Sequence, residues 1–293
     1  MLWLSASQIA SYQKCRLQRD LRYEQKLYPK FKTARLQLGI AVHEALQRYY
    51  EFPQELRTEG VLSTYYETSF ASEKEKLERA AKEEGVDAEL DFYLAMENGR
   101  KIVKEYIELD SAELIQLPVI QTELDIRVEV VPNVWGIVGK LDGVLLQEPG
   151  GFILETKVQG KAAPEDLEDY DMQTPLYSWL IKQKYGLDIK DVVYNIIAMP
   201  TARMATRIFR HKSTKSQSEI DYVMGVAQGV AKSILDKEAV YPTFNRMCKF
   251  CDYERLCQAQ RLSPSADLDW LKTTLYTPKT DVSEVEPADE SPF

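Results

Sequence analysis

The chain has 293 residues, of which 44% are hydrophobic, and a formal net charge of −9. This composition is typical of a globular protein with one large domain or two modest ones. There is no run of about 18 apolar residues and no signal-peptide pattern, so we expect no membrane span and a soluble, cytoplasmic protein, or one in host cytoplasm if a virus encodes it. The acidic charge would disfavour nucleic acid as a partner, but seven acidic residues lie in the tail after Ser263, so the charge excludes no partner class. The oligomeric state is not predicted.

The first third of the chain is predicted to be helical. Ser5 or Ser7 can cap a helix that continues through Cys15. Apolar residues at helical spacing predict further helices over 36–50, 61–82 and 88–109. We therefore assign residues 1–118 to an N-terminal helical region.

The pattern then changes to short β-rich segments separated by turn-forming proline, asparagine and glycine. The first three segments are predicted to be consecutive antiparallel strands. In chain order, the predicted elements are strands 122–131, 135–146 and 151–157, helix 166–185, strands 192–199 and 206–210, and helix 216–237. This order predicts an α/β fold with a mixed sheet flanked by helices, and a core over 119–241.

Two further segments follow the core. Residues 242–262 contain three closely spaced cysteines. Residues 263–293 lose apolar periodicity and gain acidic residues, serine and proline, so we expect a disordered tail with one anchor at Trp270.

Two carboxylates and a lysine lie on neighbouring predicted strands. Because side chains two residues apart share a face of a strand, Glu155 and Lys157 point together, and Asp142 on the preceding strand can lie beside them. Carboxylates hold Mg²⁺ or Mn²⁺, and a lysine can orient the attacking water, so the group suits phosphodiester hydrolysis. The alternative is a hairpin with ordinary surface charges. The apolar runs around these acids favour a site, because buried acids need a partner or a metal.

The four cysteines form a second candidate site. Cys15 is isolated, whereas Cys248, Cys251 and Cys257 form a compact group. Clustered thiols in a cytosolic protein favour a metal over disulfides. Four thiolates can bind either zinc or an iron–sulfur cluster, and their spacing leaves both open.

Asp142 followed by Glu155-x-Lys157 resembles the signature of the PD-(D/E)xK nucleases. Gly39-x-x-x-His43 and Gln173-x-x-x-Tyr177 are similar to motifs of the RecB-like and Cas4-like branch of these nucleases. The matched segments together run from about residue 4 to residue 257. The resemblance implies a restriction-endonuclease-like core.

The resemblance also implies roles for individual residues. His43 and the Thr156 carbonyl join Asp142 and Glu155 as metal ligands, and Gln173 and Tyr177 hold the DNA strand and the lysine. The spacing of Cys15 after Ser5 and Ser7, with the late cysteine group, is similar to the cluster-bearing AddB and Cas4-like nucleases. The resemblance therefore implies a [4Fe–4S] cluster that clips the two ends of the chain together.

The expected function is that of a metal-dependent DNA nuclease, an exonuclease on single strands or duplex ends, in recombination, repair or DNA processing. One alternative is a Cas4-like accessory factor that binds DNA ends and acts with an integrase or helicase. Another is a zinc-binding or redox scaffold held by the cysteines. The segment Gly136-x-x-Gly139-Lys140 is too short for a phosphate-binding loop, so no nucleotide site is predicted.

Overall fold

The computed structural model describes residues 1–30, 33–83, 89–112, 120–146, 149–159, 171–200, 206–263 and 266–278. The chain forms two compact units, one of Met1–Ala10 with Lys32–Glu238 and one of Ser11–Phe31 with Ala239–Phe293. The expected helical region over 1–118 is therefore divided, because Cys15 belongs to the second unit and His43 to the first. Segments that are far apart in the sequence fold together in each unit.

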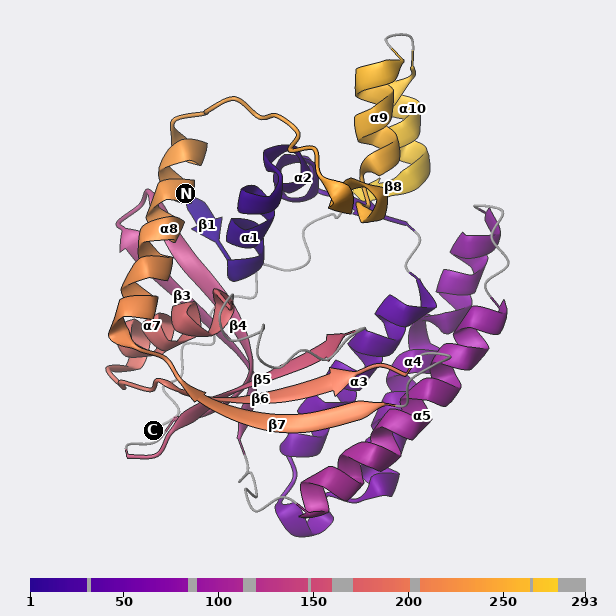
Figure 1. Ribbon diagram of the computed structural model, residues 1–293, viewed down its shortest axis with the longest axis vertical. Helices are drawn as coiled ribbons and strands as arrows, with labels where there is room; N and C mark the ends of the chain where they lie inside the picture. The colour runs from indigo at the N-terminus through magenta and orange to yellow at the C-terminus, as the bar shows by residue number, and fades with distance from the viewer. Residues whose placement is uncertain are drawn as a thin grey trace. The chain divides into compact units, whose positions relative to one another are not determined.

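A six-stranded mixed sheet forms the centre of the first unit (Figure 1). Its strand order is β1-β4-β5-β6-β7, and β3 pairs with β4. The β1–β4 and β5–β6 pairs are parallel and the other pairs are antiparallel. The strands are β1 (Leu2–Leu4), β3 (Gln121–Val131), β4 (Trp135–Leu145), β5 (Phe152–Gln159), β6 (Asp191–Ala198) and β7 (Arg207–Thr214). The predicted mixed sheet and its three consecutive antiparallel strands are confirmed, and β1 is additional.

Strand β6, between β5 and the edge strand β7, is buried along nearly its whole length, which is typical of an apolar strand covered on both faces. It lies parallel to β5, and parallel neighbours need a crossover connection. Helix α7 (Gln173–Tyr185) provides the described part of this crossover and ends at Gly186, which has the left-handed φ of 75° common at helix ends. Residues 166–170 of the predicted helix lie outside the described residues.

Helices cover both faces of this sheet. Val158 on β5 lies next to Gly39 of one helix, whereas the neighbouring Lys157 bonds to Gln173 of α7. Because successive strand residues point to opposite faces, these two helices lie on opposite sides of β5. The helices besides α7 are α3 (Ala34–Tyr50), α4 (Glu59–Glu83), α5 (Glu89–Ala112) and α8 (Gln217–Leu235). Among the described residues, no helix is both long and apolar enough to cross a membrane.

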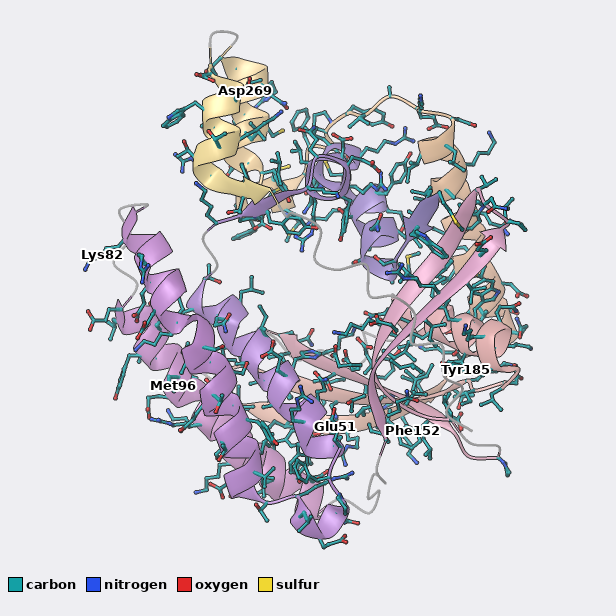
Figure 2. All side chains as sticks on the ribbon, turned by 180° about the vertical axis from the view of Figure 1, so that it is seen from behind. Glu51, Lys82, Met96, Phe152, Tyr185 and Asp269 are labelled. Carbon is teal, nitrogen blue, oxygen red and sulfur yellow. The ribbon has the colours of Figure 1, made fainter. Side chains whose placement is uncertain are left out.

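A buried ion pair fastens α5 to the sheet. Arg210 on β7 donates hydrogen bonds to Asp110 of α5 at 2.8 Å and to Asn195 of β6 at 3.0 Å, and its side chain is fully buried. Glu51 lies at the end of α3 (Figure 2). Its side chain accepts a hydrogen bond from Thr122 of β3 at 2.6 Å. These bonds fix the helical layer on the sheet that carries the carboxylates.

The second unit has a small core of its own. Five buried residues form it, and the rings of Tyr253 and Tyr276 stack with centroids 5.3 Å apart. Its strands β2 (Leu27–Pro29) and β8 (Tyr276–Pro278) pair antiparallel. The helical elements are the end of α1 (Ala6–Lys14), α2 (Arg16–Arg19), a π-helix (Asp20–Glu24), a 3₁₀-helix (Arg246–Phe250), α9 (Glu254–Leu262) and α10 (Leu268–Leu275). The core residues are Leu21, Leu27, Tyr253, Leu256 and Tyr276.

Part of the expected disordered tail is folded. Asp267 caps α10 by accepting a hydrogen bond from the Trp270 amide at 2.8 Å, and the helix leads directly into β8. Trp270 is 57% exposed and is not the expected anchor. Three leucines at helical spacing pack against the core instead: Leu268, Leu271 and Leu275. The acidic composition of the tail led us to overlook this apolar periodicity. Residues 264–265 and 279–293 lie outside the described residues.

Candidate active site

The two carboxylates lie where β4 and β5 separate. The last paired residues are Gly143 and Leu154, and Asp142 and Glu155 are their next neighbours. Asp142 Oδ2 accepts a hydrogen bond from the Thr156 amide at 2.8 Å, so its side chain bridges the diverging strands. The structure thus brings Asp142 beside the Glu155-x-Lys157 strand.

Glu155 is deeply buried among charged groups. Only 2% of the residue is exposed, and Lys157 Nζ donates a hydrogen bond to its Oε1. The other oxygen, Oε2, is buried and has no hydrogen-bond partner among the described residues. Burial raises the pKa of Glu155 to about 8; the Lys157 charge opposes this rise, and the Asp142 charge adds to it. A bound cation would release this proton and give the free oxygen a partner.

His43 approaches the same place from α3. Its Nδ1 lies 3.6 Å from Asp142 Oδ2, and its side chain is 36% exposed. Gly39, one turn earlier, is not needed for close packing of this helix, because a Cβ at Gly39 would lie 3.9 Å from its nearest neighbour, Val158 Cγ1, which is ordinary contact.

Gln173 and Tyr177 share a face of α7 and hold the lysine. The side-chain Nε2 of Gln173 donates a hydrogen bond to Tyr177 Oη at 2.7 Å, and its Oε1 accepts one from Lys157 Nζ at 2.9 Å. Tyr177 in turn donates to the Lys140 carbonyl at 2.7 Å. Pro175 does not disturb this arrangement, because it lies in the first helical turn, where amides have no helical partner. A chain of hydrogen bonds therefore runs from the β4 backbone to the Lys157 ammonium group.

Asp171 completes the site and was not predicted. Its carboxylate accepts hydrogen bonds from the backbone amide of Gln173 at 2.9 Å, from Thr174 Oγ1 at 2.6 Å and from Tyr194 Oη at 2.6 Å. Burial raises the pKa of Asp171, but the Lys157 charge and these hydrogen bonds outweigh it, so the net pKa is lowered. Its position two residues before Gln173, at the start of a helix, is the signal that could have identified it.

The carboxylates also act on Lys157. Burial lowers the pKa of this ammonium group, but the charges of Glu155 and Asp171 outweigh burial, and the net pKa is raised. Lys157 therefore remains charged at neutral pH in the metal-free site. Glu155 holds its proton near neutral pH without metal, but the carboxylates of Asp142 and Asp171 still outnumber the one ammonium group, which leaves negative charge for a divalent cation to balance.

The donor set fits Mg²⁺ or Mn²⁺. Hard carboxylate oxygens suit both ions, and Mn²⁺ also accepts an imidazole nitrogen such as that of His43. The unpartnered Glu155 oxygen supplies an available ligand atom. Within the described ranges, no three His, Cys, Asp or Glu side chains are already assembled as a metal-binding group.

Replacement of two glycines by alanine should change the stability of the protein in opposite directions. A Cβ at Gly139 would lie 2.6 Å from Leu180 Cδ1 and 2.8 Å from Tyr177 Cε1, so Gly139→Ala should destabilise the protein by about 1–3 kcal/mol. Gly39→Ala should stabilise it by up to about 1 kcal/mol, because alanine favours the helix and has room there. Urea unfolding of both variants tests this pair. Equal changes in the free energy of unfolding for the two variants would contradict the packing of α7 on Gly139.

The Glu155 pKa predicts a pH-dependent stability without metal. Between an ordinary carboxyl pKa of 4.5 and about 8, the folded protein holds a proton that the unfolded chain has released. The free energy of unfolding should therefore fall as pH rises through this window, by at most about 1.4 kcal/mol per pH unit from this group. Glu155→Gln should remove this contribution. Urea unfolding in a chelating buffer from pH 5 to pH 8 tests it, and identical slopes for the two proteins would count against it.

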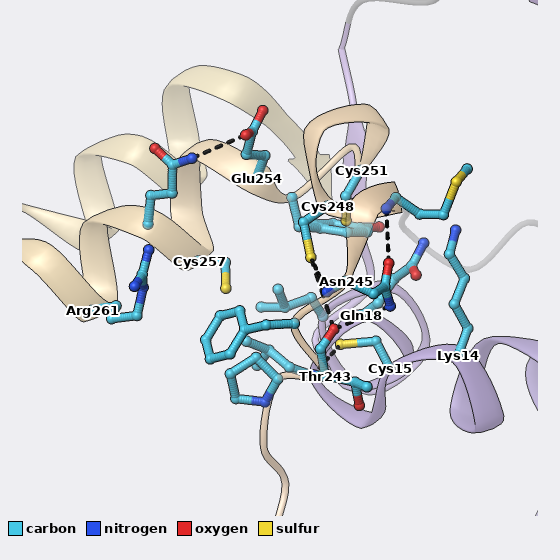
Figure 3. A pocket seen from close by; sticks show the side chains of 17 residues that line it. Lys14, Cys15, Gln18, Thr243, Asn245, Cys248, Cys251, Glu254, Cys257 and Arg261 are labelled. Carbon is cyan, nitrogen blue, oxygen red and sulfur yellow. Dashed lines mark hydrogen bonds between the residues drawn. The ribbon is translucent and has the colours of Figure 1, made fainter.

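The four cysteines line one cavity of the second unit (Figure 3). Two backbone amides point at their sulfur atoms: Thr243 N donates to Cys15 Sγ and Asn245 N to Cys248 Sγ, each at 3.4 Å. Burial raises the pKa of Cys251 and of Cys257. All four are free thiols, so no disulfide competes for them.

A comparison with protein families agrees with this fold. The family model of the PD-(D/E)xK nuclease superfamily matches residues 3–258. The chain therefore belongs to this superfamily, a class of metal-dependent nucleases. A solved structure described as "Crystal structure of SSO0001" is 17% identical, covers 65% of this chain and 80% of its own, and superposes with a TM-score of 0.36. A comparison with curated proteins found no match.

Proposed function

We propose that this chain hydrolyses DNA with Mg²⁺ or Mn²⁺ held by Asp142, Glu155, His43 and the Thr156 carbonyl. The observation that carries the proposal is the meeting of Asp142, Glu155 and Lys157, with one Glu155 oxygen buried and unpartnered. Buried carboxylates in such a position are typical of metal and catalytic sites. When bound, the metal would polarise the scissile phosphate and acidify a water.

The protein's own groups would then orient the reaction. Lys157, held between Glu155 and Gln173, would direct the attacking water and offset the charge that develops on the phosphate. Tyr177 keeps Gln173 in place through its bond to the Lys140 carbonyl. Gln173 and Tyr177 also line a cavity with Lys140 and Ser5, where we place part of the DNA strand.

We further propose an exonuclease of the RecB-like and Cas4-like branch, acting on single strands or duplex ends in recombination, repair or DNA processing. Digestion of 5′-labelled, 3′-labelled and circular single-stranded DNA with Mn²⁺ tests the proposal. Loss of end label with circular DNA intact is the expected result. Cleavage of the circle would show endonuclease activity, and no metal-dependent cleavage of any substrate would refute the nuclease itself.

A second proposal concerns the cysteine cavity, which we assign to a [4Fe–4S] cluster. Four cysteines from both ends of the chain line it, and two backbone amides already donate to their sulfur atoms. Such bonds stabilise thiolates and tune cluster potentials. Anaerobic purification followed by metal analysis distinguishes the candidates. Iron with sulfide is expected, and zinc without iron would contradict the assignment.

Removal of one ligand should loosen the second unit. Cys257→Ser is expected to lose bound metal and to speed amide exchange across 239–278, because the link between remote segments is lost. Gln260→Ser, an exposed change on the same helix, should alter neither property. Hydrogen exchange with metal analysis measures both. Unchanged exchange in metal-free Cys257→Ser would exclude a structural role.

A further inference from the structure

The second unit carries exposed rings beside exposed cations. Phe244, Met247 and Phe250 are 60%, 50% and 69% exposed. Single exposed apolar residues are ordinary on protein surfaces, but a group of them indicates an interaction site. We call the following residues the aromatic–basic patch: Phe244, Arg246, Met247, Lys249, Phe250 and Arg261.

The 3₁₀-helix Arg246–Phe250 sets the order of this patch. Residues three apart eclipse one another in such a helix, so Met247 and Phe250 lie along one edge. Arg246 and Lys249 lie along another edge for the same reason. The helix start is fixed because the Asn245 side chain accepts a hydrogen bond from the Met247 amide at 2.8 Å. An apolar row and a basic row therefore run side by side.

Each phenylalanine ring is accompanied by a cation. Lys249 Nζ lies 4.8 Å from the centroid of the Phe250 ring, and Arg261 Cζ lies 5.1 Å from that of Phe244. Both rings remain mostly exposed despite these neighbours. A flat ligand can therefore stack on a ring while an attached anion meets the cation beside it.

The patch is separate from the folding core of its unit. That core consists of other residues, with Tyr253 and Leu256 at its centre. Phe244, Met247 and Arg261 also line the cysteine cavity, whereas Lys249 and Phe250 are not among its lining residues. Phe250 therefore has neither a core nor a cavity role, and its exposure is not explained by folding.

The charge of the segments around the patch indicates that its ligand is a polyanion. Residues 11–31 and 239–262, which carry the patch, contain ten lysines and arginines against four acidic residues, whereas residues 263–293 of the same unit contain two lysines and seven acidic residues. Phosphate backbones bind through such concentrations of basic residues. Duplex bases are hidden in their stack, whereas single strands offer bases to aromatic side chains.

We propose that the aromatic–basic patch binds single-stranded nucleic acid, with bases stacked on Phe244 and Phe250 and phosphates paired with Arg246, Lys249 and Arg261. This binding requires no hydrolysis, so it stands or falls separately from the metal site. It gives the protein a hold on a single strand that is additional to its metal-site contacts.

Binding can be measured without cleavage. The full chain carrying Asp142→Asn, in magnesium-free buffer, is titrated against labelled oligo(dT), oligo(U) and a duplex of equal length, with fluorescence anisotropy as the readout. In this background, Phe250→Ala should weaken binding to oligo(dT) about fivefold or more with an unchanged salt dependence. Lys249→Gln should lower the slope of log affinity against log salt by about 0.7.

Controls separate stacking from general effects. Trp270→Ala removes a ring that is 57% exposed in the same unit but lies beside Asp267 and Asp269, and it should leave binding unchanged. Phe250→Trp should retain binding, which also shows that position 250 tolerates substitution.

Unchanged oligo(dT) affinity in both Phe250→Ala and Lys249→Gln would overturn the proposal. So would duplex binding equal to single-strand binding, or a Phe250→Ala effect on self-association alone, seen by light scattering. A preference for oligo(U) over oligo(dT) would identify RNA as the ligand.

Discussion

Asp142→Asn should reduce metal-dependent DNA cleavage about a thousandfold. Asp142 lies beside the strand that carries Glu155 and Lys157, because its Oδ2 accepts a hydrogen bond from the Thr156 amide. A catalytic metal contributes several kcal/mol of transition-state stabilisation, and each 1.36 kcal/mol is a factor of ten in rate. The asparagine keeps the shape of the side chain but loses the charge that would hold the cation. Single-turnover cleavage of end-labelled DNA measures the effect.

An aspartate-to-asparagine substitution outside the site controls for a general loss of folding or activity. Asp221 is exposed on α8, so Asp221→Asn should retain the wild-type rate. Mn²⁺ titration calorimetry should show weaker binding for Asp142→Asn only. A rate within tenfold of wild type, with Mn²⁺ affinity unchanged, would remove Asp142 from the metal site.

Lys157→Met should lower the cleavage rate about a hundredfold or more and largely retain metal binding. The ammonium group would not bind the metal; it would position the water and offset charge, roles that typically contribute about 10²–10⁴-fold to the rate. Methionine retains the apolar stem of the side chain and removes its charge. Cleavage rates at saturating Mn²⁺, with separate metal titrations, distinguish the two roles.

Lys232, exposed on α8, provides the matched control, and Lys232→Met should be neutral. Rescue is a further test. Lys157→Arg keeps the charge but changes its geometry, and it should recover part of the lost rate. If Lys157→Met loses metal binding in proportion to its rate, the lysine supports the metal site instead of the reaction.

Local sequence patterns predicted most of the first unit. Ser216 and Glu219 form a capping box at the start of α8, as helix-start residues commonly do. The apolar run over 192–199 predicted strand β6. These features depend on neighbours a few residues away, and periodicity reports them directly.

Short and remote pairings could not be predicted. Strand β1 has three residues and pairs with β4, more than a hundred residues later in the sequence. β2 and β8 likewise pair segments from opposite ends of the chain. Strands this short carry no periodicity, and their stability comes from tertiary contacts alone.

The candidate site was predictable to a similar extent. The alternation of side chains along a strand is enough to predict that Glu155 and Lys157 point the same way. Asp171 was missed because its role depends on where α7 begins and on Tyr194, a residue of a different strand. The bond from Tyr177 to the Lys140 carbonyl depends on the missing Cβ of Gly139, which only the packed structure reveals.

Locating the bound metal tests the proposed site most directly. Crystals soaked in Mn²⁺ should give an anomalous difference peak within ligating distance of Asp142 and Glu155, with His43 beside it. The peak should disappear in Asp142→Asn crystals. A peak at another position, or none at saturating Mn²⁺, would contradict the assignment of these residues as the metal site of a nuclease.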